Sequence, residues 1–264
     1  MTVTVTTSQI PDSDASPGPP WPKDATRDRL VGDWHIYQRR GGHRTSTDDL
    51  LTAWFCTQRC VRPVQTYLDL GCGTASVLLM TAYVLRPASS VGVEAQAQSA
   101  QLATRSVAEL PKGAPTIEIV NNDFRAVDWD ERRFDVITGS PPYFPIGSGQ
   151  LPDDAQRRAC RFEERGGIEE YCQTAAAALK PEGDFYVVFQ STWDDRVLRA
   201  AELAGLQLRA RADVEARQGR GPFLTVYEFT RSAKQVRKIS FAVRDDAGNW
   251  TAAFEELRRS MGYS

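Results

Sequence analysis

The chain has 264 residues, with 32 Lys and Arg against 34 Asp and Glu and a formal net charge of −2. This near balance excludes a polybasic coat for nucleic acid and an acidic tail, although it permits a local basic face. With five cysteines, an odd number, and only two histidines, neither a disulfide framework, a metal centre nor histidine-based catalysis is expected. The length suits one domain that needs no disulfide or structural metal to fold.

Residues 1–30 are predicted to form a disordered N-terminal arm, followed by a single domain over 31–264. The first 22 residues contain five prolines and no Lys or Arg. Such a segment buries too little apolar surface to offset the entropy lost on ordering. It lacks the basic start of a secretory signal and the arginines of a transit peptide, and no apolar run approaches the roughly 18 residues of a membrane span. We therefore expect a cytoplasmic protein with no membrane partner.

After residue 33, the spacing of apolar residues alternates between the strand and helix periods. WHIYQRR is predicted to be a strand, and STDDLLTAWFCTQRC to be a helix that begins at Ser46 with acids in its first turn. Further strands are expected at 66–70, 90–94, 116–120, 134–140, 184–190, 206–217, 223–231 and 238–244. Further helices are expected at 75–85, 96–110, 168–179, 193–204 and 251–261.

This alternation of apolar strands with helices indicates an α/β, doubly wound fold. We expect a mostly parallel seven-stranded sheet covered on both faces, with strands 206–217 and 223–231 as an antiparallel pair at one edge. Ligands bind at the carboxyl ends of the strands in such folds, so the loops that follow strands are the candidate functional segments.

LDLGCGTAS at 68–76 joins the first parallel strand to a helix. Gly71 and Gly73 allow a tight turn and a close approach of the backbone to a ligand. No GK[ST] follows, which excludes a P-loop, and Ser76 stands where a dinucleotide fingerprint has Gly or Ala. The remaining interpretation is S-adenosylmethionine, a cationic ligand without phosphate, with Asp69 and Cys72 beside it.

Two more carboxylates follow the next two strands. Glu94 lies 21 residues after Gly73, where a carboxylate can accept hydrogen bonds from both hydroxyls of a ribose. Asp123 follows the third strand, where it can accept from an adenine amino group. One such acid alone is usually a solvated residue at a strand end, but three beside a Gly-x-Gly turn predict an S-adenosylmethionine site. NAD stays an alternative, because Glu94 can serve it too.

GSPPYF at 139–144 follows the fourth strand and is the candidate catalytic loop. Pro141 and Pro142 fix φ and remove two backbone donors, so the local carbonyls face outward. An amine conjugated to a ring is a weak nucleophile. A site that accepts both its hydrogens, at the Ser140 hydroxyl and the Pro141 carbonyl, turns the lone pair towards a methyl donor. Tyr143 offers a flat face on which a base can stack. A structural Pro-Pro turn with a packed tyrosine is the alternative.

LDLGCGT, VGVE, NNDF and SPPYF, in this order, resemble the class I S-adenosylmethionine-dependent amino-methyltransferases. With WHIYQ, HRTSTDDLLTAW and CRFE at 160–163, residues 33–264 resemble more narrowly the bacterial valine-tRNA adenine-N6 methyltransferases. The resemblance implies a Rossmann-like methyltransferase fold. By this resemblance the cofactor is held by Gly71, Gly73, Glu94 and Asp123. The target amine is held by the SPPY loop, Ser140 to Tyr143, and Thr47 and Asp48 lie near the site entrance.

This chain has Ser140 where the family has Asn. SPPY is also similar to the motif of DNA cytosine-N4 methyltransferases, and NPPY to that of release-factor glutamine-N5 methyltransferases. The expected activity is methylation of an exocyclic amine of a base, most simply adenine N6 in tRNA or another structured RNA. Two alternatives stay open: methylation of a protein glutamine, and an inactive cofactor-binding partner subunit in which Ser140 marks lost catalysis.

Three Arg-rich stretches are candidates for contact with RNA phosphates. One precedes the first helix, and one lies in the long loop 145–166, predicted to be a substrate-facing lid. The third, 195–239, has ten Lys and Arg against five Asp and Glu. Together they would form a basic rim, or else Arg–Glu pairs on solvated faces. The candidate substrate-binding residues of the lid and its approach are Phe144, Arg158 and Arg161.

Overall fold

The computed structural model describes residues 19–129 and 133–263. The strands are β1 (Ala25–Val31), β2 (Trp34–Arg39), β3 (Thr66–Leu70), β4 (Ser89–Val93), β5 (Thr116–Val120), β6 (Phe134–Gly139), β7 (Leu179–Gln190), β8 (Gln207–Arg217), β9 (Pro222–Thr230) and β10 (Arg237–Arg244). The α-helices are α1 (Thr47–Arg59), α2 (Ser76–Leu85), α3 (Ala97–Ala108), α4 (Ala155–Arg161), α5 (Ile168–Ala178), α6 (Asp194–Leu203) and α7 (Ala252–Ser260). Two 3-10 turns are η1 (Phe124–Ala126) and η2 (Ser191–Trp193).

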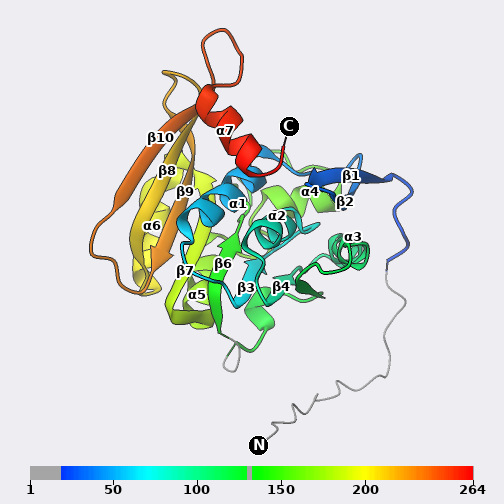
Figure 1. Cartoon of the computed structure of the whole chain (residues 1–264). Coiled ribbons are helices and arrows are strands. Elements are labelled where there is room, and N and C mark those ends of the chain that lie inside the picture. The colour runs from blue at the N-terminus through cyan, green and yellow to red at the C-terminus, as the bar shows by residue number, and fades with distance from the viewer. Residues whose placement is uncertain (1–18, 130–132, 264) are drawn as a thin grey trace, which may run out of the picture.

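The central sheet has the strand order β10-β8-β9-β7-β6-β3-β4-β5. Every neighbouring pair is parallel except β7–β9 and β8–β9, so β9 runs against all the others. The strand order reverses between β3 and β6, and such a reversal opens a crevice at the carboxyl ends of the strands. The predicted α/β, doubly wound class is confirmed (Figure 1).

Two details of the prediction are wrong. The sheet has eight strands instead of seven, because β10 pairs in parallel with β8 and takes the edge that we expected β8 and β9 to form. Phe241 of β10 explains this pairing, since its ring meets that of Trp54 on α1 at 5.3 Å and so gives the added strand an apolar face to cover.

Residues 25–30 of the predicted disordered arm belong to a strand instead. Residues 25–31 form β1, an antiparallel partner of β2 in a separate two-stranded sheet. Leu30 and Val31 at its end are buried, and β1 packs against α2, so this part of the arm contributes to the core. Residues 1–18 of the predicted arm lie outside the described residues.

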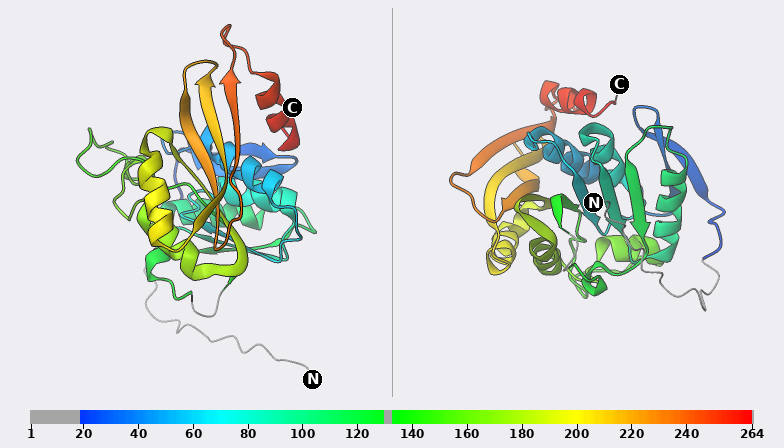
Figure 2. Two further views of the ribbon diagram at one scale, coloured as in Figure 1. Left: turned by 90° about the vertical axis from the view of Figure 1, so that its left-hand side faces the viewer. Right: turned by 60° about the horizontal axis from the view of Figure 1, so that its bottom comes forward.

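Helices cover both faces of the central sheet (Figure 2, right). One buried cluster joins α1, α2 and α7 to one face, and a second joins α5 and α6 to the other. β7 supplies both clusters by alternation, with Tyr186 and Val188 on the first side and Phe185, Val187 and Phe189 on the second. In the described part of the chain, no helix combines the length and the apolarity that crossing a membrane would require.

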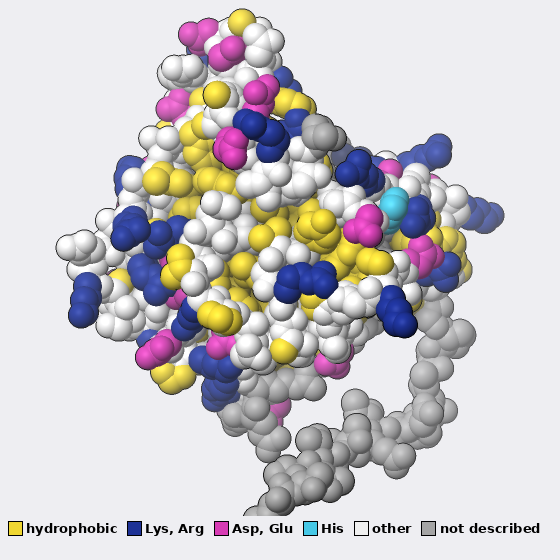
Figure 3. Space-filling view, viewed as in Figure 1, with side chains coloured by type: hydrophobic (Ala, Val, Ile, Leu, Met, Phe, Trp, Pro, Cys, Tyr) yellow, Lys and Arg dark blue, Asp and Glu magenta, His cyan; other side chains and the backbone are white. Residues whose placement is uncertain are grey.

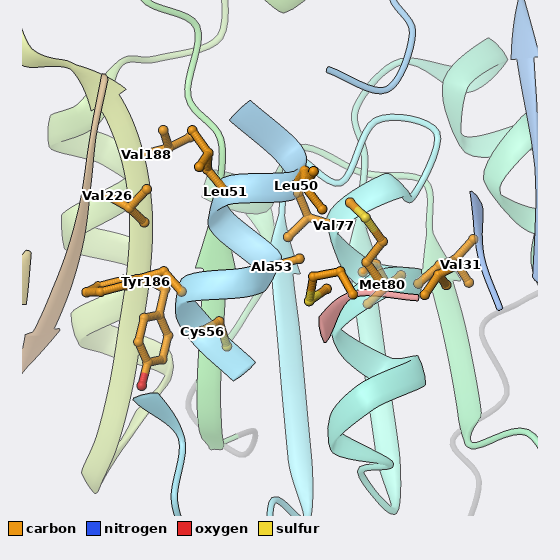
Figure 4. Close-up of a cluster of buried hydrophobic side chains, with 14 of the residues drawn as sticks. Val31, Leu50, Leu51, Ala53, Cys56, Val77, Met80, Tyr186, Val188 and Val226 are labelled. Atoms are coloured by element: carbon orange, nitrogen blue, oxygen red, sulfur yellow. The ribbon is translucent and has the colours of Figure 1, made fainter. Parts of the chain in front are cut away.

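Helix α1 connects the sheet to α2 (Figure 4). Ser46 and Asp49 form a capping box at its start, which satisfies backbone donors of the first turn. Its apolar face then packs between two groups of side chains, Tyr186, Val188 and Val226 from the sheet and Val77 and Met80 from α2. The first turn of α1 is thereby fixed close to the catalytic edge.

Leu51→Ala is expected to lower the free energy of unfolding by about 2–5 kcal/mol, because Leu51 is 0% exposed and its loss leaves a cavity between α1 and the sheet. Leu203→Ala is the matched control, since Leu203 is 68% exposed on α6 and should change the value by less than about 0.5 kcal/mol. Urea denaturation measures both. Equal effects of the two substitutions would contradict this account of the core.

Candidate active site

A central pocket lies at the carboxyl ends of β3, β4 and β6, where the strand order reverses. It holds about 850 Å³ including its open mouth. Ser140 and Pro142 of the candidate catalytic loop line this pocket. All six predicted cofactor residues line it as well: Asp69, Gly71, Cys72, Gly73, Glu94 and Asp123. Residues from four separate loops thus meet at one place.

The glycine loop needs glycine at two positions. Gly71 has φ +62° and Gly73 has φ +57°, a region that favours glycine. A Cβ at Gly71 would also collide with the hydroxyl of Tyr171, whereas nothing lies within 4 Å of the Cβ position at Gly73. The backbone at Gly73 therefore leaves space that a ligand can enter.

Glu94 holds this loop in place from the end of β4. The Gly73 N–H donates to Glu94 Oε2 at 2.9 Å, and the Gln96 N–H donates to Oε1 at 2.7 Å. Burial raises the pKa of Glu94, and the two backbone donors oppose that rise. Each carboxylate oxygen keeps acceptor capacity for a ligand hydroxyl.

Asp69 is buried at the end of β3 with one oxygen unpaired. Its Oδ1 accepts from the Thr138 hydroxyl at 2.7 Å, while Oδ2 has no hydrogen-bond partner. Burial, reinforced by the charges of Asp49 and Glu94, raises the pKa of Asp69 to about 8. An unpaired, proton-binding carboxyl at the pocket wall is suited to a cationic ligand.

Asp123 lies at the pocket mouth and is already paired. Its oxygens accept from the Arg125 backbone N–H at 3.0 Å and from the Arg125 guanidinium at 2.6 Å and 2.9 Å. These bonds lower the pKa of Asp123, and Arg165 across the mouth lowers it further. Asp123 is therefore an ionised acceptor whose oxygens are shared with Arg125.

Ser140 has a buried hydroxyl with no hydrogen-bond partner, and the residue lines the central pocket. Three residues on, the Tyr143 hydroxyl donates to Asp48 Oδ2 at 2.5 Å. Burial beside Asp48 raises the pKa of Tyr143 well above its usual range, so the phenol stays protonated. The Tyr143 ring meets Phe189 edge-on at 5.1 Å, which fixes its plane.

A second pocket, which we call the Tyr143 pocket, opens beside that ring and holds about 750 Å³ including its mouth. The SPPY loop contributes to both pockets, with Ser140 and Pro142 in the lining of the central pocket and Tyr143 in that of the second. Its lining comes from α1, β7, η2 and β9: Asp48, Tyr143, Gln190, Thr192, Pro222, Phe223 and Leu224.

Four predicted substrate residues line neither pocket. Phe144 instead ties the SPPY loop to residues 161–163, through Phe144 N–H to Arg161 O at 3.0 Å and Glu163 N–H to Phe144 O at 2.9 Å. Arg161 lies over the Phe144 ring at 5.7 Å, and Arg158 pairs with Glu164 at 2.7 Å. Thr47 is the first residue of α1 and also lies outside both linings.

Loop 145–166 covers the central pocket, a different position from the substrate-facing lid that we expected. It contains α4, and Ala159, Cys160, Arg165 and Gly166 line the central pocket. Its end is fastened by Arg196, which bonds Glu163 and Glu169, each at 2.7 Å.

Sequence reasoning missed several residues of the central pocket. Asp49 is buried and accepts from the Ser76 hydroxyl at 2.9 Å, which joins the starts of α1 and α2. Its position beside Asp48 was a signal, but an acid in a first turn is ordinarily explained by capping. No pattern marks five more of the missed residues, which come from loops, from α4 and from α5: His43, Gln96, Cys160, Arg165 and Tyr171.

About half of the cations of the predicted basic rim are paired with acids. Within 195–239, ion pairs hold Arg196, Arg199, Arg209, Arg211 and Lys238. Before α1, Arg39 pairs with Asp24 and Asp154, and Arg44 pairs with Asp28. On the face in Figure 3, Lys and Arg lie in small groups with acids between them. The alternative of Arg–acid pairs therefore accounts for about half of these cations.

The central pocket fits S-adenosylmethionine better than a dinucleotide. The unpaired Oδ2 of Asp69 and the buried carboxyl of Asp49 offer acceptors for cationic groups, and Glu94 offers acceptors for ribose hydroxyls. A dinucleotide would place its pyrophosphate at the N-terminus of α2. That helix begins at Ser76 with no acid or base in its first turn, and the Asp49 carboxyl is bonded to Ser76 itself. A carboxyl at this position is unfavourable to the negative charge of a pyrophosphate.

Comparison with known proteins agrees with this chemistry. A methyltransferase-domain family model matches residues 68–167. The tRNA1(Val) (adenine(37)-N6)-methyltransferase of Bacteroides thetaiotaomicron is 31% identical over 226 residues, which cover 85% of this chain and 92% of the relative. The enzyme of the same name from Tolumonas auensis is 26% identical over 228 residues, with the same two coverages, 85% and 92%.

Two solved structures share the fold at low sequence identity. One is the crystal structure of a predicted O-methyltransferase from Agrobacterium tumefaciens. It aligns with a TM-score of 0.60 and 18% identity over 83% of this chain and 98% of that chain. The methyltransferase subunit of a type I restriction-modification system from Streptococcus thermophilus aligns at 0.53 and 16% identity, over 83% of this chain and 52% of that one. The chain is an S-adenosylmethionine-dependent methyltransferase and belongs to the tRNA1(Val) (adenine(37)-N6)-methyltransferase family.

Proposed function

We propose that the enzyme methylates the exocyclic amine of an adenine in tRNA, at N6. The observation that carries the proposal is the Ser140 hydroxyl, which is buried at the central pocket without a partner, one loop away from the Tyr143 pocket. A buried polar group without a hydrogen bond is costly, so an unpaired hydroxyl at a pocket wall indicates a ligand group that it is built to meet.

We assign the cofactor contacts to the residues of the central pocket. Glu94 and Asp123 would bind the ribose hydroxyls and the adenine amine of S-adenosylmethionine, and Asp69 would meet its cationic part. Gly71 and Gly73 let the backbone approach closely. When bound, this cofactor supplies an electrophilic methyl group on its sulfonium sulfur.

The SPPY loop would then position the acceptor amine. Ser140 Oγ and the Pro141 carbonyl accept its two hydrogens, which turns the nitrogen lone pair towards the central pocket. The base stacks on the ring of Tyr143, and the hydrogen bond from the Tyr143 hydroxyl to Asp48 fixes the position of that ring. Catalysis on this account is mainly positioning, and it requires no metal and no covalent intermediate.

The substrate assignment is supported by the names of the relatives, which specify adenine 37 of a valine tRNA. Arg217 and Arg220 lie at the tip of the β8–β9 hairpin, close in the chain to Pro222 and Phe223 of the Tyr143 pocket. On this proposal the two arginines contact phosphates of a folded RNA. Such a substrate places the enzyme in the cytoplasm, where tRNA is found.

The test uses tritiated S-adenosylmethionine with total tRNA, followed by digestion to nucleosides. We expect label in N6-methyladenosine and its loss from a valine tRNA transcript with adenine 37 replaced. Label in a protein glutamine and none in RNA would overturn the proposal in favour of glutamine-N5 methylation. Calorimetric cofactor binding without turnover on either substrate would favour an inactive partner subunit.

Ser140→Ala is expected to lower kcat about tenfold, because one of the two acceptors for the amine is lost, an effect of about 1.4 kcal/mol. The affinity for the cofactor should stay within about twofold of the wild-type value. Ser148→Ala is the matched control, since Ser148 is exposed and donates only to Pro145 O within its own loop. Single-turnover kinetics and calorimetry give the two quantities, and a parallel loss of cofactor affinity would contradict the role.

A further inference from the structure

Gln190 is a polar side chain of the Tyr143 pocket that the mechanism above does not use. It ends β7, next to β6 in the sheet, and the register pairs Gly139 with Val187. Continuing that register places Gln190 level with Pro142, in the middle of the SPPY loop. On its other side Gln190 pairs with Leu224 of β9, beside Phe223.

The side chain of Gln190 faces the same side of the sheet as α1. Tyr186 and Val188, four and two residues earlier, lie in the buried cluster that contains α1, and alternation carries this direction on to Gln190. The Tyr143 hydroxyl is held on that side by Asp48. The amide of Gln190 therefore lies beside the tyrosine in one pocket.

This amide is free to bind a ligand. Among residues 19–129 and 133–263, the structure gives the Gln190 side chain no hydrogen-bond partner. The walls around it are largely apolar, formed by Tyr143, Phe223 and Leu224, and the acid in the lining is already bonded to the tyrosine. Flat apolar walls with a planar donor–acceptor group at one side match the shape of a purine and its edge.

We infer that Gln190 determines acceptor specificity by donating a hydrogen bond from Nε2 to the ring nitrogen next to the exocyclic amine. This inference rests on the proposed function. In adenine, N1 lies on one side of the exocyclic amine, on the Watson–Crick edge, and N7 lies on the other, on the Hoogsteen edge, and an amide side chain recognises such an edge well. With the ring nitrogen held by Gln190, the amine is directed towards Ser140 and Pro141, on the neighbouring strand end.

The test combines a variant with altered bases. Gln190→Met keeps the length of the side chain and removes the donor. Valine tRNA is assembled with adenosine, 1-deazaadenosine or 7-deazaadenosine at the target position, each analogue having C–H in place of one ring nitrogen. Gln235→Met is the matched control, since Gln235 lies after β9 at the opposite end of the sheet, in a different pocket.

We expect Gln190→Met to lower kcat/KM for adenosine about 5- to 100-fold, and the wild type to lose a similar factor with one of the two analogues. On that analogue the variant should lose no further activity, because the same hydrogen bond is already missing. Gln235→Met should behave as wild type on all three substrates.

Two results would overturn the inference about Gln190 while leaving the proposed function intact: losses that multiply when variant and analogue are combined, and full activity of Gln190→Met on adenosine. A wild-type enzyme that fails to methylate unmodified tRNA would instead remove the proposed function, and the assignment of Gln190 with it. The wild-type reaction on adenosine therefore separates the two failures.

Discussion

Tyr143→Ala is expected to lower kcat/KM for tRNA about 10- to 100-fold and to leave the affinity for S-adenosylmethionine unchanged. Stacking of a base on an aromatic side chain contributes roughly 1–3 kcal/mol, and about 1.4 kcal/mol corresponds to a factor of ten. The Tyr143 ring is held in place for this role by Phe189 at 5.1 Å and by its hydroxyl on Asp48. Steady-state kinetics with tRNA and calorimetry with the cofactor measure the two quantities.

Two further substitutions make this prediction specific. Tyr143→Phe keeps the ring and loses only the bond to Asp48, so it should retain most of the activity. Tyr37→Ala removes a tyrosine whose hydroxyl bonds Glu109, away from both pockets, and should leave kcat/KM unchanged. If Tyr143→Phe and Tyr143→Ala were equally impaired, the hydroxyl and not the flat ring would be the important group.

The second large effect is a pH dependence of cofactor binding. In the free protein the pKa of Asp69 is raised to about 8 by burial, so this carboxyl is neutral at pH 6. A cationic ligand favours the ionised form, and that form becomes available only as the pH rises towards 8. The dissociation constant for S-adenosylmethionine should therefore fall by up to about tenfold per pH unit from pH 6, then level off above pH 8.

Asp69→Asn tests this assignment by calorimetry from pH 6 to 9. The amide cannot ionise, so the variant should bind weakly at every pH, about as weakly as the wild type does at pH 6. The amino group of the cofactor titrates in the same range, but it does so with both proteins and cancels in their ratio. Asp49 and Glu94 also have raised pKa values, and a slope that persists in Asp69→Asn would assign the proton to one of them instead.

The class of fold was predictable because it follows from periodicity. Continuous apolar strands such as TYLDL, alternating with amphipathic helices, leave a covered parallel sheet as the arrangement that buries both kinds of surface. The pairing of β10 was not predictable. Its residues read as a strand, but its place beside β8 depends on the contact of Phe241 with Trp54, nearly 190 residues earlier.

β1 was missed for a related reason. Residues 25–31 contain three charged side chains, Arg27, Asp28 and Arg29, and follow a Pro-rich stretch, so local composition favours disorder. Pairing with β2 satisfies the backbone, and burial of Leu30 and Val31 against the core offsets the cost of ordering. Neither gain is visible until the partner strand is in place.

In the site, sequence reasoning found residues of the central pocket where they follow a strand end. The glycine loop, Glu94, Asp123 and the SPPY loop each come directly after a parallel strand, and the topology brings all such ends to one edge. It failed where the residue lies on a helix or in the covering loop, as with Tyr171 and Arg165. Their distance to the pocket is set by helix packing and loop conformation, which no local pattern encodes.

The sequence by itself indicated the chemistry: a Gly-x-Gly turn with nearby carboxylates fits a cationic cofactor, and the SPPY loop is our proposed site for a conjugated amine. These depend on residue type and on short spacings that the backbone preserves in any context. Only the tertiary structure decided how the charges are used. It paired Arg196, Arg209 and Arg211 with acids, left Asp69 Oδ2 unpaired, and placed Gln190 beside Tyr143. Charge pairing and burial depend on which distant strands and helices become neighbours, and that is fixed by packing of the whole chain.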